Sequence, residues 1–232
     1  MKNKHNELEK NINVVFDNAE LLKTALMHRS YLNEHKKTKY ESNEKLEFLG
    51  DSVLSLITSS YLFDKYPNYS EGEYTDIKAS LVRTETLAQA AQKINLGEYI
   101  YLSKGENGSG GRTNKNILAD GFEALIGAIF IEKGFNKAYN FTKIYLFEDK
   151  IDEIIDKKLY FSSKSKLQEL IQRKYKTTPD YTLIKEAGPE HKRIFNIGIY
   201  LNGRKLGDGV GKSKKQAEEE AARKALQKLK SK

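Results

Sequence analysis

The sequence contains no cysteine, which excludes disulfide bonds, zinc sites with cysteine ligands and a cysteine nucleophile. Histidine is nearly as scarce, and its four scattered residues argue against a histidine-rich metal site. The first 30 residues carry charges throughout and lack an apolar segment, so no secretory signal is expected. The longest nearly apolar run, residues 117–131, is too short to cross a bilayer. We therefore expect a cytoplasmic protein that does not enter a membrane.

Aromatic residues and positive charge, by contrast, are plentiful. The 14 tyrosines and 10 phenylalanines can supply a sizeable core. The net charge of +8 is uneven, because residues 1–160 carry a net charge of −2 and residues 161–232 one of +10. This asymmetry predicts a basic, polyanion-binding module attached to another working domain. A merely solubilising basic tail is the alternative.

Residues 7–135 show mostly the apolar periodicity of helices, and residues 137–158 are expected to form a further helix. Gly105, Gly108, Gly110 and Gly111 indicate that residues 103–114 form a loop. A helix should end at Gly134, and the charge balance changes near residues 157–163. The predicted helices cover residues 19–26, 44–63, 74–94, 117–131 and 137–158.

The last 70 residues follow a different pattern. A helix is expected over 165–175 and strand candidates over 181–184 and 194–201. Asn202-Gly203 is typical of a type I′ hairpin, which leads into a third strand that ends near 207–211. Ser213 should then cap a helix, with Gln216 at the third position of a capping box. The order of elements is α-β-β-β-α.

Five acidic residues lie in two predicted helices at positions that do not favour negative charge. Glu44, Glu47 and Asp51 fall on one side of their predicted helix, and Asp120 and Glu123 are the only charges of a second, apolar one. Burying an unpaired carboxylate costs on the order of several kcal/mol. Oxygen ligands suit Mg²⁺ or Mn²⁺, so the two helices are expected to meet around divalent cations. Alternatively, these acids are exposed or pair with distant lysine or arginine residues.

The small neighbours of these acids, Gly50, Ser52, Gly121 and Ala124, are expected to leave room beside them, which favours a site. The basic tail supplies a second set of candidates. Backbone N–H groups and lysines at the start of the last helix can bind phosphate. Polar side chains on the first tail helix can meet 2′-hydroxyls and base edges in a shallow minor groove of RNA. The candidate RNA-binding residues are Gln168, Glu169, Gln172, His191, Lys212, Ser213, Lys214 and Lys215.

Two segments resemble bacterial ribonuclease III. Residues 44–54, EKLEFLGDSVL, are similar to the signature of that family, and residues 117–128, ILADGFEALIGA, to its second acidic motif. The tail is similar to the double-stranded-RNA-binding domain of that family, including GPEH at 188–191 and GKSKK at 211–215. The resemblance covers nearly the whole chain in family order.

The resemblance implies a mainly α protein: an all-helical, dimerising endonuclease domain over 1–156, a linker over 157–162 and a small α+β RNA-binding domain over 163–232. It further implies Mg²⁺-dependent hydrolysis of double-stranded RNA, with Mn²⁺ able to substitute, that leaves 5′-phosphate ends and short 3′ overhangs. Ribosomal RNA precursors and structured messenger RNAs are the expected substrates. No small-molecule cofactor is expected.

Motif matching gives each acid a role. Glu47, Asp120 and Glu123 are expected to be metal ligands, and Asp51, with Glu123, a central catalytic acid. Glu44 would be an outer acid, and Glu71 a supporting acid near the partner subunit's site, with Glu73 as the nearby alternative. Two rival functions stay open. One is a non-catalytic RNA-binding protein with a degenerate nuclease domain, which should have lost central acids. The other is a phosphohydrolase of small nucleotides, which would leave the basic tail without a role.

Overall fold

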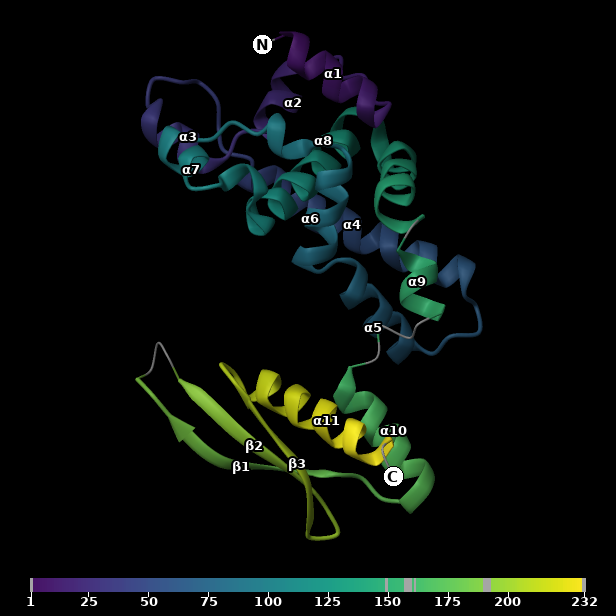
Figure 1. Ribbon diagram of the computed structural model, residues 1–232. Helices are drawn as coiled ribbons and strands as arrows, with labels where there is room; N and C mark the ends of the chain where they lie inside the picture. The colour runs from purple at the N-terminus through teal and green to yellow at the C-terminus, as the bar shows by residue number, and fades with distance from the viewer. Residues whose placement is uncertain (1, 149, 157–159, 161, 190–192, 231–232) are drawn as a thin grey trace. The chain divides into compact units, whose positions relative to one another are not determined.

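Helices dominate the computed structural model, which divides into two units, Met1–Tyr160 and Phe161–Lys232 (Figure 1). It describes residues 2–148, 150–156, 160, 162–189 and 193–230. The first unit consists of helices, and the second joins two helices to a three-stranded sheet. The predicted fold class is therefore confirmed. The domain limits 1–156 and 163–232 stay predictions, and residues 157–159 and 161 of the predicted linker lie outside the described residues.

The first unit is organised around two long helices, α4 (Glu44–Lys65) and α8 (Lys115–Thr142), which pack against each other. Both carry the acids singled out in the sequence. α2 (Ala19–Ala25) and α6 (Thr84–Lys93) cover α8 further. Gly134 interrupts α8 with a backbone φ of 77°, which confirms the predicted break, although helical structure resumes directly after it. The remaining elements are α1 (Lys2–Ile12), α3 (Arg29–Glu34), α5 (Glu71–Leu81), η1 (Leu96–Glu98), α7 (Lys104–Gly108), η2 (Gly111–Thr113), η3 (Lys143–Phe147) and α9 (Ile151–Asp156).

The prediction of a single helix over residues 74–94 was wrong, because α5 ends at Leu81 and α6 begins at Thr84. Apolar periodicity continues across the break and conceals it. Arg83 adopts extended backbone angles, and the Thr86 hydroxyl donates a hydrogen bond of 2.9 Å to the Ser80 carbonyl. This side-chain bond satisfies a carbonyl at the end of α5 that the helix itself leaves free.

Two other expectations in the first unit also need correction. Residues 103–114 are not simply a loop, since Ser103 caps the short helix α7 by accepting a hydrogen bond of 3.0 Å from the Glu106 amide. The four glycines in this segment indicated a loop, and the Ser103 cap was therefore not predicted. The helix expected over 137–158 is divided among the end of α8, the π-helical turn η3 and α9.

The second unit has the predicted order: α10 (Ser163–Tyr175), β1 (Asp180–Ala187), β2 (Ile194–Leu201), β3 (Arg204–Gly211) and α11 (Lys214–Lys230). The strands form an antiparallel sheet in the order β1-β2-β3. Asn202 and Gly203 have φ angles of 49° and 77°, the combination that a type I′ turn requires. The tail hairpin is therefore as predicted.

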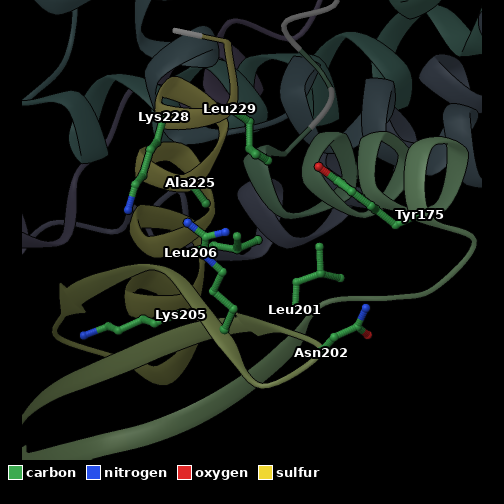
Figure 2. A pocket seen from close by; sticks show the side chains of 9 residues that line it. Tyr175, Leu201, Asn202, Lys205, Leu206, Ala225, Lys228 and Leu229 are labelled. Carbon is green, nitrogen blue, oxygen red and sulfur yellow. The ribbon is translucent and has the colours of Figure 1, made fainter. Parts of the chain in front are cut away.

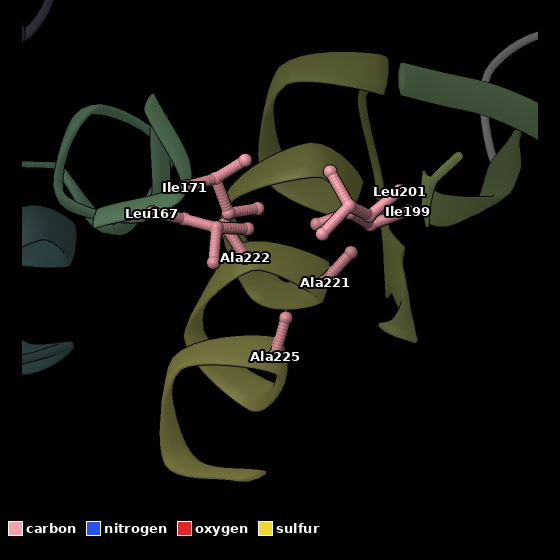
Figure 3. Close-up of a cluster of buried hydrophobic side chains, with 7 residues drawn as sticks. All are labelled: Leu167, Ile171, Ile199, Leu201, Ala221, Ala222 and Ala225. Carbon is pink, nitrogen blue, oxygen red and sulfur yellow. The ribbon is translucent and has the colours of Figure 1, made fainter. Parts of the chain in front are cut away.

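Small residues let α11 pack closely between the sheet and α10 (Figure 3). Ala221, Ala222 and Ala225 are fully buried on this helix. Leu167 and Ile171 reach them from α10, and strand β2 contributes further apolar side chains, Ile199 and Leu201. This core fixes α11 relative to the sheet.

A cavity of about 410 Å³ opens beside the C-terminal part of α11 and the β2–β3 turn (Figure 2). Leu201, Leu206 and Leu229 line it together with the cations Arg204, Lys205 and Lys228. None of these is a predicted site residue, and the lysines at the start of α11 lie at the other end of that helix. Within the described residues, no helix combines the length and the apolar composition needed to cross a bilayer.

Candidate active site

The crossing of α4 and α8 places the acidic side chains. A Cβ atom on Gly50 would lie 1.8 Å from the backbone oxygen of Glu123, a distance that no side chain tolerates. Gly50 therefore allows α4 and α8 to pack closely. The sequence-based expectation that Gly50 leaves room beside the acids was wrong. Gly121 is also packed, but against side chains rather than a helix backbone, because a Cβ there would lie 3.0 Å from a methyl group of Ile100 and 3.4 Å from one of Leu96. The close crossing holds two helices with acidic faces at a short distance.

Three of the predicted acids meet at this crossing. Carboxylate oxygens of Glu47, Asp120 and Glu123 lie within 4.8 Å of one another, and each residue is half-buried. Glu47 comes from α4, whereas Asp120 and Glu123 lie one turn apart on α8. We call these three residues the carboxylate cluster. They are the same residues that motif matching nominated as metal ligands.

Burial and mutual repulsion disfavour the charged forms of the cluster. Burial, followed by the nearby charges of Asp51, Glu47 and Asp120, raises the pKa of Glu123 to about 8. The pKa of Asp120 is raised by burial, and that of Glu47 by burial and by the charges of Asp120 and Glu44. The three carboxylates offer only oxygen ligands, and a bound divalent cation would stabilise their charged forms. Such a set of ligands fits a hard divalent cation. The residues present thus suit the metal that the sequence led us to expect.

The remaining two acids of these motifs, Asp51 and Glu44, lie beside the cluster. Asp51 is exposed one turn after Glu47 and lies near enough to Glu123 to raise its pKa. Glu44 is exposed at the start of α4 and accepts a hydrogen bond of 2.6 Å from the Ser42 hydroxyl. The structure therefore brings Glu44 and Asp51 to the rim of the cluster.

Glu71 belongs to a separate place in the first unit. It is exposed at the first residue of α5 and is not a member of the carboxylate cluster. Its neighbour Glu73 forms a capping box with Ser70, in which the Glu73 carboxylate accepts a hydrogen bond of 2.9 Å from the Ser70 amide. Glu73 thus stabilises the start of α5, whereas Glu71 accepts only a side-chain bond of 3.2 Å from Thr75 among those described.

A cavity of about 340 Å³ adjoins the cluster and contains two residues that the sequence analysis missed, His28 and Arg29. Asn43, Glu44, Glu47 and Asp120 complete its lining. The distance from Arg29 Nη1 to Glu44 Oε1 is 3.7 Å. One acid, Glu44, thus pairs with an arginine that is distant in sequence, which is the alternative that the sequence analysis left open. No sequence spacing connects residues 28 and 29 to the acidic motifs, because α3 is a separate six-residue helix.

The predicted RNA-binding residues occupy the second unit. Gln168, Glu169 and Gln172 are exposed on α10. Lys212, Ser213, Lys214 and Lys215 are exposed at the start of α11, and His191 lies outside the described residues.

Ser213 caps α11 by accepting a hydrogen bond of 3.2 Å from the Gln216 amide. The Gln216 side chain accepts from the Lys212 amide at 3.1 Å, one residue before the partner that a capping box predicts. This cap fixes the lysine-bearing segment at the helix N-terminus.

Both units are similar to known proteins. The family model described as "Ribonuclease-III-like" matches residues 18–150, and the model described as "Double-stranded RNA binding motif" matches residues 163–229. The chain is 46% identical over 227 residues to Ribonuclease 3 of Geobacillus sp. (strain WCH70), which covers 98% of this chain and 92% of that protein. It is 45% identical over 216 residues to Ribonuclease 3 of Borreliella burgdorferi, at 93% and 87% coverage.

A solved structure of the nuclease domain of ribonuclease III from Campylobacter jejuni matches with a TM-score of 0.57 and 38% identity. It covers 62% of this chain and 95% of that domain. A helical unit with a carboxylate cluster, joined to a double-stranded-RNA-binding motif, is the architecture of an RNA-directed nuclease. The chain belongs to the ribonuclease III family.

Proposed function

We propose that this protein is an endoribonuclease that hydrolyses phosphodiester bonds of double-stranded RNA with the help of Mg²⁺. One observation carries the proposal: Glu47, Asp120 and Glu123 gather their carboxylates within 4.8 Å in a chain that also contains a double-stranded-RNA-binding motif. A degenerate nuclease domain would not need to retain this set. A phosphohydrolase of small nucleotides would not need the second unit.

The three cluster residues would hold the cation through carboxylate oxygens, and Mn²⁺ should substitute because it prefers the same ligands. When bound, such a cation makes a water ligand more acidic and offsets negative charge on the phosphate. Asp51 and Glu44, at the rim, would orient water around the cluster by accepting hydrogen bonds. Glu123, protonated at neutral pH without metal, would release its proton when it becomes a ligand.

We further propose a homodimer built through α4. Three large apolar side chains of this helix are exposed: Phe48 at 78%, Leu56 at 58% and Phe63 at 71%. Their spacing places them on one face of α4, and an apolar stripe of this kind on a water-exposed helix indicates a partner. A second copy of the chain would cover it. The Campylobacter jejuni nuclease domain, to which this chain is similar, is itself described as having a flexible region involved in dimer formation.

In such a dimer, Glu71 would support the partner's site, because the Glu73 carboxylate is already used in capping α5. Two sites related by twofold symmetry would cut both strands of a duplex. We therefore propose products with 5′-phosphate ends and short 3′ overhangs. Ribosomal RNA precursors and structured messenger RNAs in the cytoplasm are the proposed substrates.

The decisive experiment is a cleavage assay on a labelled RNA duplex with and without MgCl₂. Wild type should cut only with the metal, and ligation should detect 5′-phosphates on the products. Glu123→Gln keeps the size of the side chain but removes the negative charge that holds the cation, so cleavage should fall by orders of magnitude while duplex binding stays near normal. Metal-independent cutting, or hydrolysis of mononucleotides in preference to duplex, would contradict the proposal.

A further inference from the structure

Arg29 brings a permanent positive charge into the wall of the acidic cavity. The carboxylates of Glu44, Glu47 and Asp120 line the same cavity of about 340 Å³. A phosphodiester group approaching this wall meets negative charge from these acids. Arginine is well suited to offset that repulsion, because its planar guanidinium matches phosphate oxygens with two parallel hydrogen bonds.

The guanidinium is available to a ligand. Its contact with Glu44 is long, at 3.7 Å, and the two side chains are 74% and 57% exposed. An exposed pair at this distance contributes little to stability. A stabilising ion pair with Glu44 therefore does not explain the presence of Arg29 at this position.

The backbone around Arg29, in contrast, is tied to the residue that precedes α4 and to the segment around Tyr101. The Asn43 amide, directly before α4, donates a hydrogen bond of 2.8 Å to the Met27 carbonyl. The His28 amide donates one of 3.2 Å to the Tyr101 carbonyl, in the segment that leads toward α8. Arg29 is thus held at a defined place beside the acids although its side chain is exposed.

Side-chain bonds anchor α3 to that same segment. The Ser103 amide donates to the Ser30 hydroxyl at 3.1 Å, and the Lys104 amide donates to both Glu34 carboxylate oxygens at 3.0 and 3.1 Å. The Ser30 hydroxyl also lies 2.8 Å from His28 Nδ1. These bonds connect regions about 70 residues apart in sequence and fix the position of α3.

We propose that Arg29 binds a phosphate of the RNA strand at the acidic cavity and thereby positions that strand for cleavage. The inference rests on the proposed function, because it assumes that a duplex enters this cavity. It adds a substrate contact in the first unit to the phosphate contacts of the second. Inorganic phosphate has the same chemistry, so it serves as a competitor in the test.

The test measures duplex binding by fluorescence anisotropy across a series of KCl concentrations, with every chain carrying Glu123→Gln so that no RNA is cut. Adding Arg29→Ala should weaken binding by about tenfold and flatten the dependence of log K on log salt by roughly one unit. Arg29→Lys should retain most of the slope. Lys45→Ala is the matched control, because Lys45 is an exposed cation one residue after Glu44 that pairs with Glu41 at 2.8 Å and does not line the cavity.

With Glu123 intact, Arg29→Ala should raise KM for the duplex more than it lowers kcat, and its melting temperature should stay close to that of wild type. A salt slope equal to that of Lys45→Ala would overturn the inference. A loss of binding that is explained by a loss of folded protein would also overturn it. The same holds if millimolar phosphate competes equally well with the duplex in the Arg29→Ala variant and in its parent. Failure of the proposed function is distinguishable, since wild type itself would then not cut the duplex.

Discussion

Gly127 approaches Gly50 so closely that a Cβ atom on Gly127 would lie 3.2 Å from the Gly50 amide nitrogen and 2.3 Å from the Leu46 carbonyl oxygen. Two helices thus touch backbone to backbone next to the carboxylate cluster. Glu47 precedes Gly50 by three residues and Glu123 precedes Gly127 by four, so the contact sets the distance between these two carboxylates. The crossing links the core to the chemistry of the site.

We expect Gly50→Ala to destabilise the first unit by about 3 kcal/mol, at the upper end for overpacking, because backbone atoms cannot yield as a side chain can. Gly72→Ala is the control: it lies in α5 with nothing within 4 Å of a new Cβ, and it should gain about 0.5–1 kcal/mol. Urea unfolding of the metal-free chain measures both. Equal stability of the two variants would contradict the role given to the crossing.

The stability of the metal-free protein should depend on pH through Glu123. Burial beside other acids raises its pKa from 4.5 to about 8. Between these values the folded chain holds a proton that the unfolded chain has released, so the free energy of unfolding falls as pH rises. Glu123→Gln removes this effect, and its advantage over wild type should grow from pH 4.5 to 8 and then level off. Urea unfolding in EDTA at several pH values measures it, with the exposed Glu98→Gln as control; a constant difference would refute the effect.

Binding of Mg²⁺ should release protons. At pH 7 the raised pKa keeps Glu123 largely protonated, and a carboxylate must lose its proton to become a ligand. Calorimetric titration with MgCl₂ in buffers of different ionisation enthalpy should detect release of nearly one proton per site. Release should decrease above pH 8, while affinity rises up to that pH. Glu123→Gln should bind weakly, and binding without proton release by wild type would argue against Glu123 as a ligand.

Dimer formation should depend on the apolar stripe of α4. We expect the double change Phe48→Glu and Phe63→Glu to give a monomer at micromolar concentration, because charges cannot be buried in an apolar interface. Sedimentation velocity of the full chain measures this. Ile184→Glu in β1 is the control, since Ile184 is also exposed, at 44%, but belongs to the second unit. A monomeric wild type would exclude the paired-site mechanism.

Local patterns predicted much of this structure, and long-range contacts explain where they failed. The α-β-β-β-α tail followed from periodicity, from Asn202-Gly203 and from the Ser213 cap, all of which act within a few residues. Helical spacing placed Glu47 on one acidic face and Asp120 and Glu123 on another, and the cost of burying unpaired carboxylates indicated that the two faces meet around a cation. The break between α5 and α6 escaped because it depends on the Thr86 side chain and not on glycine or proline.

The position of Arg29 could not be read from the sequence for the same reason. It depends on hydrogen bonds from Ser103 and Lys104 to α3, across about 70 residues. The role of Gly50 was misread because composition alone does not distinguish a glycine that leaves space from one that a neighbouring backbone fills. Both cases need the packing of distant segments against each other.

The lysines at the start of α11 should carry phosphate contacts of the second unit. Replacing Lys212, Lys214 and Lys215 by Ala should weaken binding of all duplex sequences alike and flatten the slope of log K against log salt by roughly one unit or slightly less per lost contact. The matched control replaces Arg204, Lys205 and Lys228, three cations beside the cavity at the other end of α11, and removes the same charge. If both triple variants flatten the slope equally, the lysines act through net charge alone. A flatter slope only in the first variant, measured by anisotropy on two unrelated duplexes, would assign the contacts to the helix N-terminus, where the Ser213 cap holds the lysines in place.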